Sequence, residues 1–523
     1  MRPIAYRFRA ATSLGLATAP CRLRTGASDR PILSPQTNCR RPPKSPILPA
    51  ILLYSILLVS WFTATTAIAA TRPHYGGTLR VMMQSTPNAL DLPPSATPAE
   101  YWDLSRTLSL IGDTLVTLDA EGHPRPALAI AWQSDATARH WEFTLRPGVR
   151  FHDGSEASPS AVAGILGKLH STWSIRASLN SVTIESEAAM PSLLAELALP
   201  QNLLLRRAKD KDKDNDGLPA GTGAFVVSQW QPGKVLKLVA NEQSWSGRPF
   251  IDAIEIQFGK SLSDQALALE LAKTDMIEAS PQAATGAQRG GAASSSLPVE
   301  LLALVFSANS KAQDPRLREA LALAIDRKPI QSVLLKGAGE AAASILPNWM
   351  TGYTAVFSTQ ADPQRARVLL ADSRQPVLNL TYDPRDPRAQ LIAERIALNA
   401  REAGIILQVS LSGAADIRLA RIVLPSPDPA TSLSEAARQL GLPRPAFSLS
   451  HMSSLDDLYQ AEHSLLDGAV VIPLFHLPVA SASSTRVMNW QPGRLGEWGE
   501  LSDPGSSLAD AWVERSLPEA GVR

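Results

Sequence analysis

Cysteine is nearly absent from this chain of 523 residues. Only Cys21 and Cys39 occur, both within the first forty residues. The long remainder can therefore form no disulfide and no thiolate metal site. The eight histidines are scattered, and no two of them lie four residues apart as in a zinc-binding helix. We expect neither a metal ion nor another cofactor.

The familiar catalytic motifs are missing as well. The chain has no G-x-S-x-G elbow, no P-loop and no G-x-G-x-x-G stretch that follows a strand. A hydrolase would need a nucleophile and a base, and no such pair is visible in the sequence. The chain is therefore expected not to be an enzyme.

Positive charge is concentrated at the beginning of the chain. Residues 1–70 carry nine Lys or Arg against one acid, Asp29, which gives a net charge of +8. Subtracting this value from the +1 of the whole chain leaves −7 for residues 71–523. An acidic remainder argues against nucleic acid as a partner.

An uncharged apolar run, Ile47–Ile68, follows these basic residues and ends in small residues at Ala69/Ala70. This order predicts a signal peptide cleaved near that point, and hence export to the periplasm. A retained anchor helix is the alternative, because the run is nearly long enough to span a bilayer. Neither cysteine follows a short apolar run, so we expect no lipid anchor. The leader is unusually long for a signal peptide, so a true start codon downstream of Met1 is the alternative to a start at Met1.

The first half of the remaining chain alternates apolar and polar residues in a way that predicts strands. The predicted strands are 77–83, 108–118, 225–230, 235–240 and 251–258. A hairpin is predicted to turn at Pro147-Gly148 between residues 141–145 and 149–151. Ser158-Pro159 predicts the start of a helix, with serine as the N-cap.

The second half predicts further helices and a β-α-β unit. Asp314-Pro315 and Asp362-Pro363 each combine an N-cap residue with proline at the first helical position. The strand, helix and strand of the β-α-β unit are predicted at 377–382, 388–403 and 405–411. Two segments, 281–296 and 425–457, are predicted to lack regular structure.

Four sequence blocks, found in a fixed order, are the most specific feature. They run over Gly76–Val81, Leu128–Gly154, Gly221–Pro249 and Asp314–Arg327. In this order they resemble the large periplasmic solute-binding proteins of family 5, which serve dipeptide, oligopeptide and nickel importers. The resemblance extends from residue 76 to about residue 480.

The resemblance implies an α/β fold of the two-lobed periplasmic binding protein type (type II, large cluster), with an extra subdomain in lobe I and a ligand cleft at the hinge. The implied divisions are a leader with signal peptide at 1–70, lobe I at 71–258 with a subdomain at about 114–215, lobe II at 259–478, and a return to lobe I at 479–523.

The resemblance also implies a ligand site with walls from both lobes. The expected ligand-binding residues are Asn88, Thr222, Gly223 and Phe225 from lobe I, and Asn309, Trp349 and Asp428 from lobe II. Structural roles remain open for several of them. Thr222-Gly223 fits a turn, Asn309 a strand-end cap, and Asp428 an N-cap before Pro429.

The chain departs from its peptide-binding relatives at one point. In those relatives a motif of the type W-x-x-D-Y-x-D-P supplies the acid that pairs with the amino group of the peptide. Asp428-Pro429 matches the end of this motif, but the tryptophan is absent and Pro425 stands in the place of the acid. Proline cannot pair with an ammonium, and an unpaired buried ammonium costs several kcal/mol. A free peptide amine is therefore not the expected anchor.

Two metal hypotheses were weighed against simpler interpretations. Asp212, Asp214, Asp216 and Gly217 copy the first half of a calcium loop, but the twelfth position is Gly223 and not glutamate. A solvated charged loop is therefore expected there. A nickel complex is the alternative ligand, because relatives bind such complexes. Direct coordination of the metal by this chain is not expected, because it lacks a histidine cluster.

Together these features predict an exported monomer that captures a small peptide-like solute by closing its lobes. The expected partners are the permease subunits of an ABC importer. The alternative is an orphan binding module of the same fold that senses a solute or assists folding in the periplasm.

Overall fold

The computed structural model describes residues 73–93, 96–207, 218–280, 291–353, 356–370, 376–386, 388–411, 414–442, 454–498 and 507–514. All of them belong to one compact unit, Arg72–Arg523. Across these ranges, no helix combines the length and the apolar character that a membrane crossing requires. The predicted leader with its cleavage point at Ala69/Ala70 and the calcium-like loop from Asp212 to Gly217 lie outside the described residues.

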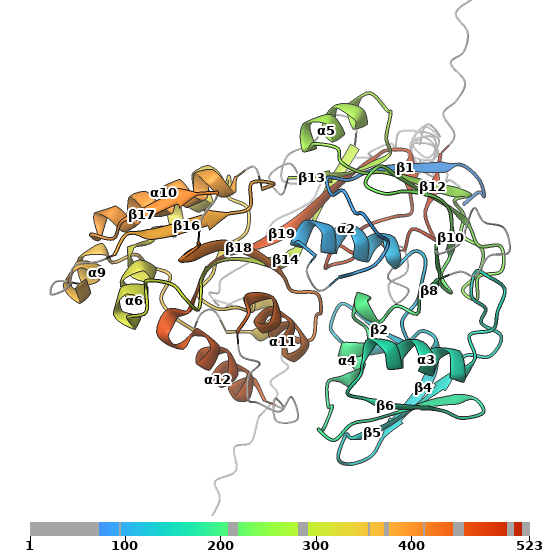
Figure 1. The fold of residues 1–523 in the computed structure, drawn as a ribbon. Helices are drawn as coiled ribbons and strands as arrows, with labels where there is room; N and C mark the ends of the chain where they lie inside the picture. The colour runs from blue at the N-terminus through green and yellow to red at the C-terminus, as the bar shows by residue number, and fades with distance from the viewer. Residues whose placement is uncertain are drawn as a thin grey trace, which may run out of the picture. The chain divides into compact units, whose positions relative to one another are not determined.

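An eleven-stranded mixed sheet is the main element of the fold (Figure 1). Its strands follow the order β10-β11-β12-β1-β13-β19-β14-β18-β16-β17, and β15 pairs with β19. Their bounds are β1 (Thr78–Met82), β10 (Phe225–Gln231), β11 (Val235–Ala240), β12 (Ala253–Gln257), β13 (Met276–Ala279), β14 (Gly291–Phe306), β15 (Glu340–Ala341), β16 (Leu378–Tyr382), β17 (Leu407–Ser410), β18 (Ile417–Val423) and β19 (Val471–Ser484).

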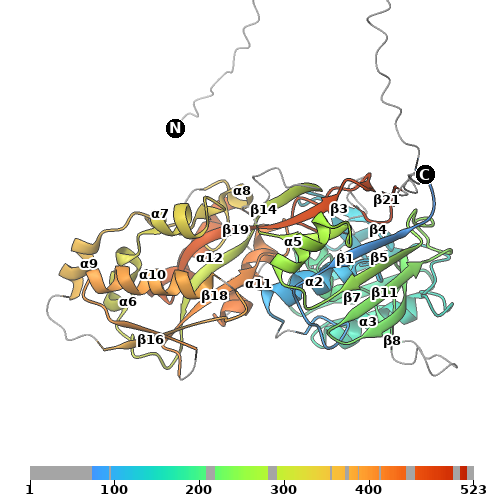
Figure 2. The same cartoon turned by 90° about the horizontal axis from the view of Figure 1, so that it is seen from above.

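The central pair of this sheet, β14 and β19, is also its longest, with 16 and 14 residues. The two strands lie antiparallel and side by side (Figures 1 and 2). Their register shifts on both sides of Pro298, which stands opposite Pro478. Proline has no N–H to donate, so two facing prolines interrupt the hydrogen-bond ladder. The long strand pair is therefore weakest at this point.

A smaller antiparallel sheet has the order β4-β5-β7-β6. Its strands are β4 (Ala129–Ser134), β5 (His140–Leu145), β6 (Ser174–Ala177) and β7 (Ser181–Glu185). Helices α3 (Pro159–Leu169) and α4 (Leu193–Leu197) share its apolar core. Three two-strand pairs complete the described strands: β2 (Val116–Leu118) with β3 (Pro124–Pro126), β8 (Arg206–Arg207) with β9 (Pro219–Ala220), and β20 (Val487–Met488) with β21 (Trp512–Val513).

The remaining helices pack mainly against the large sheet. They are α2 (Pro98–Leu108), α5 (Leu262–Glu270), α6 (Pro315–Ala324), α7 (Arg327–Pro329), α8 (Asn348–Thr351), α9 (Pro363–Leu370), α10 (Ala389–Glu402), α11 (Pro429–Leu440) and α12 (Leu455–Leu466). Short turns of other helix types occur at Pro200–Asn202, Ile330–Leu334 and Asp467–Ala469.

The buried apolar side chains form separate cores. The first core joins residues 79–276 to residues 490–513, and so contains both ends of the described chain. The second core, within 115–204, belongs to the small sheet. A third core, within 301–477, covers both faces of the large sheet: Leu302 and Leu304 contribute to one cluster, and Leu301 and Val305 to the other. This alternation follows from the two-residue period of a strand.

Most sequence predictions of regular structure are confirmed. The strands at 77–83, 225–230, 235–240 and 251–258 correspond to β1, β10, β11 and β12. Ser158 and Asp314 cap α3 and α6 as expected, and a helix, α9, begins at Pro363. The β-α-β unit is formed by β16, α10 and β17, with the two strands parallel.

Two predictions in the first half were wrong. Residues 108–118 are not one strand, because Thr97 and Glu100 form a capping box that starts α2, and this helix reaches Leu108. The hairpin at Pro147-Gly148 does not form either. Both edges of β5 are already paired, with β4 and β7, and the chain after Gly148 makes only an isolated bridge at Arg150.

Parts of the two segments predicted without regular structure do form regular structure. Residues 291–296 begin β14, where small side chains face the equally small residues Ala480–Ser484 of β19. Residues 429–440, inside the predicted featureless segment 425–457, form α11. Asp428 caps this helix, and its buried residues Leu433, Ala437 and Leu440 recur at helical spacing.

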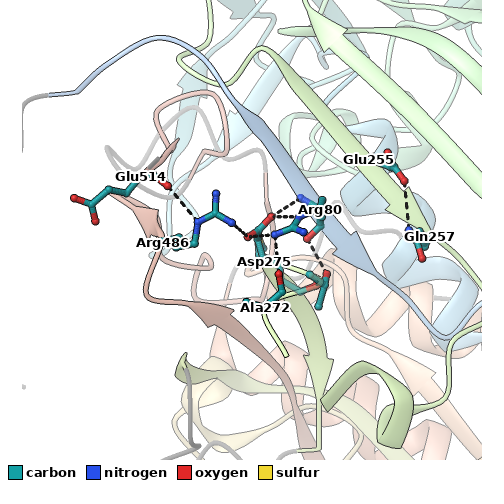
Figure 3. Close-up of polar contacts among 9 residues, drawn as sticks. Arg80, Glu255, Gln257, Ala272, Asp275, Arg486 and Glu514 are labelled. Atoms are coloured by element: carbon teal, nitrogen blue, oxygen red, sulfur yellow. Dashed lines mark hydrogen bonds and ion pairs between the residues drawn. The ribbon is translucent and has the colours of Figure 1, made fainter. Parts of the chain in front are cut away.

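Asp275 ties together distant parts of the chain (Figure 3). Its side chain is 1% exposed and accepts hydrogen bonds from Arg80 Nε at 3.0 Å and Arg486 Nη1 at 3.2 Å. Arg486 Nε in turn donates to the carbonyl of Glu514 at 3.2 Å. One buried carboxylate therefore links β1, the loop before β13, the chain after β19 and the last described residue.

We predict that Asp275→Asn lowers the free energy of unfolding by about 2–4 kcal/mol, because two arginines lose their anionic partner. Denaturant unfolding measures the change. The control is Glu319→Gln, which removes an exposed pair with Arg365 at 3.5 Å and should cost less than about 0.5 kcal/mol. Equal losses in the two variants would contradict the role given to Asp275.

Candidate functional site

A cavity of about 140 Å³ lies beside α2. Its walls come from α2, the chain from Ser109 to Ala120, the region Ala195–Leu203, the segment Pro425–Pro427 and the segment Arg494–Glu497. An engineered apolar cavity of about 150 Å³ holds one benzene molecule. The cavity therefore has room for a group the size of one side chain.

Helix α2 forms one wall of the cavity and is fixed at both ends. The capping box of Thr97 and Glu100 defines its start. Residues 102–108 are all buried. The indole of Trp102 donates to Glu300 Oε1 at 3.1 Å, and Glu300 lies on β14 close to Pro298. The helix is thereby attached to the central strand pair.

Arg106 lies on α2, lines the cavity and is 3% exposed. Its Nε donates to the carbonyl of Gly496 at 2.8 Å. The guanidinium lies near two indole rings, 5.7 Å from the centroid of Trp102 and 5.6 Å from that of Trp498. These contacts hold the cation in one position at the cavity wall.

Glu497 lines the same cavity. Burial raises its pKa to about 7, while the nearby charge of Arg106 and hydrogen bonds from backbone groups oppose that increase. One of those bonds is the 3.2 Å contact from the Leu495 backbone N–H to Oε2. Near neutral pH this carboxyl therefore exists in both protonation states.

Asp113 connects the cavity to a residue expected to bind the ligand. Its Oδ2 accepts from the hydroxyl of Thr222 at 2.7 Å and from the indole of Trp245 at 2.9 Å. Burial raises the pKa of Asp113, and these two hydrogen bonds oppose the rise. Thr222, at 1% exposure, therefore supports the cavity wall from behind.

The rim of the cavity contains two ion pairs. Asp119 binds Arg125 through Oδ2, with 2.6 Å to Nη2, and Arg494 binds Glu121 at 3.0 Å. Gly122 lies in the same turn between β2 and β3. A Cβ added at this glycine would lie 3.7 Å from the carbonyl oxygen of Pro427. This turn therefore meets the segment that precedes α11.

None of the seven expected ligand-binding residues is among those that line this cavity. Pro425 lines the cavity, whereas Asp428 caps α11 by accepting from the Thr431 N–H at 2.8 Å. Trp349 packs behind the cavity with Trp102 and donates to the Pro298 carbonyl at 2.8 Å. The expected residues therefore divide between the cavity's surroundings and more distant places.

The remaining expected residues lie outside this cavity as well. Gly223 donates its N–H to the Ile111 carbonyl at 2.9 Å, and Phe225 is fully buried in the first core. Asn88 lines a second, larger hollow of about 1300 Å³. Asn309 is exposed in the turn after β14.

The cavity residues that sequence reasoning missed include Tyr101, Arg106 and Glu497. The first two lie on a helix that had been overlooked, although Thr97-Pro98 and Glu100 together form a recognisable helix start. Glu497 has no sequence signal of its own, because only folding brings residue 497 next to residue 106. Within the described ranges, no group of three His, Cys, Asp or Glu side chains could hold a metal ion.

Comparison with known proteins shows what the chain resembles. The family model described as bacterial extracellular solute-binding proteins, family 5 middle, matches residues 176–428. This part of the chain is therefore similar to that family. Di/tripeptide-binding protein 2 of Pseudomonas aeruginosa is 22% identical, over 62% of this chain and 67% of its own length. The nickel-binding periplasmic protein of Escherichia coli is 25% identical, over 58% of this chain and 66% of its own length.

Solved structures confirm the expected fold class, the two-lobed α/β binding-protein fold. A dipeptide-binding protein from Pseudoalteromonas, in complex with Met-Leu, has a TM-score of 0.70 at 18% identity and covers 84% of this chain and 100% of its own. NikA from Staphylococcus aureus, in complex with Ni(L-His)2, has a TM-score of 0.67 at 17% identity and covers 80% and 97%.

Glu497 gives a pH-dependent prediction. Its pKa rises from 4.5 to about 7 on folding, so the stability it contributes is complete below pH 4.5 and is lost as the pH rises through 7. We expect Glu497→Gln to gain about 1–3 kcal/mol of unfolding free energy relative to wild type at pH 8, and little at pH 4. Urea unfolding at both pH values measures this, and an equal effect at pH 4 and pH 8 would argue against it.

Gly223 gives a second prediction. A Cβ at this position would lie 2.7 Å from the carbonyl carbon of Ile111, so Gly223→Ala should cost about 1–3 kcal/mol of stability. The control is Gly167→Ala in α3, where a Cβ meets nothing within 4 Å and should add about 0.5–1 kcal/mol. Thermal unfolding distinguishes the two. If Gly223→Ala unfolds at the same temperature as wild type, the structural role of Gly223 is contradicted and its expected role in ligand binding is favoured.

Proposed function

We propose that this chain is the solute-binding component of an ABC importer and captures a short peptide or peptide-like solute between two lobes. The observation that carries the proposal is the cavity at α2. Its walls come from α2 and the chain after it on one side, and from Pro425–Pro427 on the other. A solute that touches both sides would favour the closed state, because closure requires differential contact.

The proposed lobes follow the divisions expected from the sequence. Lobe I comprises 71–258 and 479–523 with a subdomain at about 114–215, and lobe II comprises 259–478. The first core supports this division, because it combines residues 79–276 with 490–513. The separate cores within 115–204 and 301–477 fit the subdomain and lobe II. The facing prolines of β14 and β19 are the proposed hinge.

The size of the cavity favours a small solute. About 140 Å³ suits one side chain of a dipeptide or a compact complex, and not a long peptide. Two similar solved structures hold compact ligands, Met-Leu in one and Ni(L-His)2 in the other. The proposal is therefore capture without turnover, of a dipeptide-sized solute.

The proposed place of action is the periplasm, with delivery to permease subunits as a monomer. The basic leader followed by Ile47–Ile68 supports export. An orphan sensor or folding helper is the second candidate. It is favoured by Pro425, which lines the cavity where peptide-binding relatives would place an acid.

Solute capture predicts that the mature protein is stabilised by its ligand and that filling the cavity prevents this. A ligand at a hundred times its Kd adds about 2.7 kcal/mol to the unfolding free energy. We expect this stabilisation with at least one member of a panel of dipeptides and the Ni–histidine complex, measured by thermal shift and native mass spectrometry. Ala120→Trp, which fills the cavity from its wall, should remove it.

The matched control is Ala188→Trp, at an exposed position outside the cavity. It should bind as wild type does. Stabilisation that survives Ala120→Trp would place the solute elsewhere, and a panel without any binder would overturn the proposal. Binding without solute uptake by cells that contain the importer would favour the sensor candidate.

A further inference from the structure

Arg106 differs from the other cations near the cavity. Arg494 pairs with Glu121 at 3.0 Å, and Arg125 pairs with Asp119. Arg106 is more deeply buried than either, yet no carboxylate of the described residues lies within 4.0 Å of it. Its Nε is bound to the Gly496 carbonyl, while neither terminal nitrogen has a hydrogen-bond partner in the described chain. A buried cation without an anionic partner is stabilised when an anion binds to it.

The surroundings of Arg106 keep its guanidinium in place at the cavity wall. The rings of Trp102 and Trp498 lie within 6 Å of it. Gly496 has a φ of +88°, and a Cβ at that position would lie 3.1 Å from Nη2 of Arg106. Glycine therefore permits the close approach that fixes the side chain. A planar fork held in this way suits a carboxylate, which it can bind through two parallel hydrogen bonds.

Three acids influence Arg106 from neighbouring elements without forming an ion pair with it. Asp103, on the same helix, accepts from the Ser85 N–H at 3.3 Å, and Glu300 on β14 accepts from Trp102 and Arg421. Glu497 follows the Gly496 carbonyl that binds Arg106. Burial raises the pKa of all three, which weakens their competition with another anion. Asp113 in the same cavity is occupied by Thr222 and Trp245.

The opposite wall has no charge of its own. The residues contributed there are Pro425, Ser426 and Pro427, and none has a carboxylate that could form an ion pair with an ammonium group. The cavity therefore has a fixed cation on the α2 side and no charge at residues 425–427. Three carboxylates line it elsewhere, but Asp113 is bound to Thr222 and Trp245, Asp119 is bound to Arg125, and burial raises the pKa of Glu497. Arg106 is thus the lining cation that a carboxylate of a solute could approach.

We propose that Arg106 binds a carboxylate group of the captured solute, so that the site selects solutes by their acidic end. The proposal rests on the proposed function and specifies its ligand chemistry. A peptide would enter with its C-terminal carboxylate towards α2, and its amino group would need no charged partner from residues 425–427.

Three related probes separate the two ends of a peptide. Met-Leu has both charges, N-acetyl-Met-Leu retains only the carboxylate, and Met-Leu amide retains only the amine. Isothermal titration with the mature wild-type protein should give Kd values for the first two within about threefold of each other. The amide should bind at least about 30-fold more weakly, because a charged hydrogen-bonded partner is lost.

Arg106→Gln should weaken Met-Leu and N-acetyl-Met-Leu by at least about 30-fold and leave the amide unchanged. Arg106→Lys retains the charge without the fork and should fall between Arg106→Gln and wild type. The control Arg365→Gln, an exposed arginine on α9, removes the same charge far from α2 in sequence and should bind as wild type does. Circular dichroism checks that each variant is folded.

The wild-type comparison does not depend on the folding of any variant. Equal binding of all three probes would leave solute capture intact and overturn the role of Arg106. Tight binding of the amide with loss of the acetylated peptide would reverse the proposed orientation and also overturn it. A wild-type protein that binds none of the three overturns both the peptide-like solute class and the carboxylate site.

Discussion

The antiparallel pairing of β14 with β19 is the constraint on which the rest of the structure depends. β19 pairs with β13 and β14 pairs with β18, so the pair β14–β19 joins the two halves of the sheet, β10 to β13 and β18 to β17. The ladder is interrupted on both sides of Pro298, opposite Pro478, and its register shifts once more between Leu302 and Ala303. Where a continuous strand pair lacks inter-strand hydrogen bonds, it can bend at a low cost in free energy, while the packed cores on each side remain intact.

The cavity depends on the same pair through α2. Trp102 attaches the helix to Glu300, two residues beyond Pro298, and Trp349 donates to the Pro298 carbonyl itself. The cavity wall formed by α2 is therefore attached to β14 next to Pro298, where the strand pair is proposed to bend. Bending at the prolines would move Pro425–Pro427 relative to Arg106, which is the motion that a binding protein of two lobes requires.

Local signals predicted much of the fold, and long-range contacts explain what was missed. Ser158, Asp314 and Asp362 mark helix starts whose mechanism lies within four residues, and the sequence was sufficient for them. Residues 291–296 became a strand only because equally small residues of β19 lie opposite, which no local pattern contains.

The candidate site was predicted less well than the fold. The expected site residues came from family resemblance, and the structure brings only some of them near the cavity. Thr222 supports its wall through Asp113, and Asp428 caps a helix. Pro425, which the sequence analysis singled out, lines the cavity. The pairing of Arg106 with the Gly496 carbonyl joins positions 390 residues apart, and the sequence offers no sign of it.

The carboxylate of Asp275 has a consequence for the biogenesis of the protein. It joins Arg80, near the start of the described chain, to Arg486 and the carbonyl of Glu514 at its end. The first core also needs Trp490, Leu508 and Val513, which are synthesised after its residues 79–276. The packing of this core can therefore be completed only after residues 490–513 have been synthesised, so this core forms late in the folding of the chain.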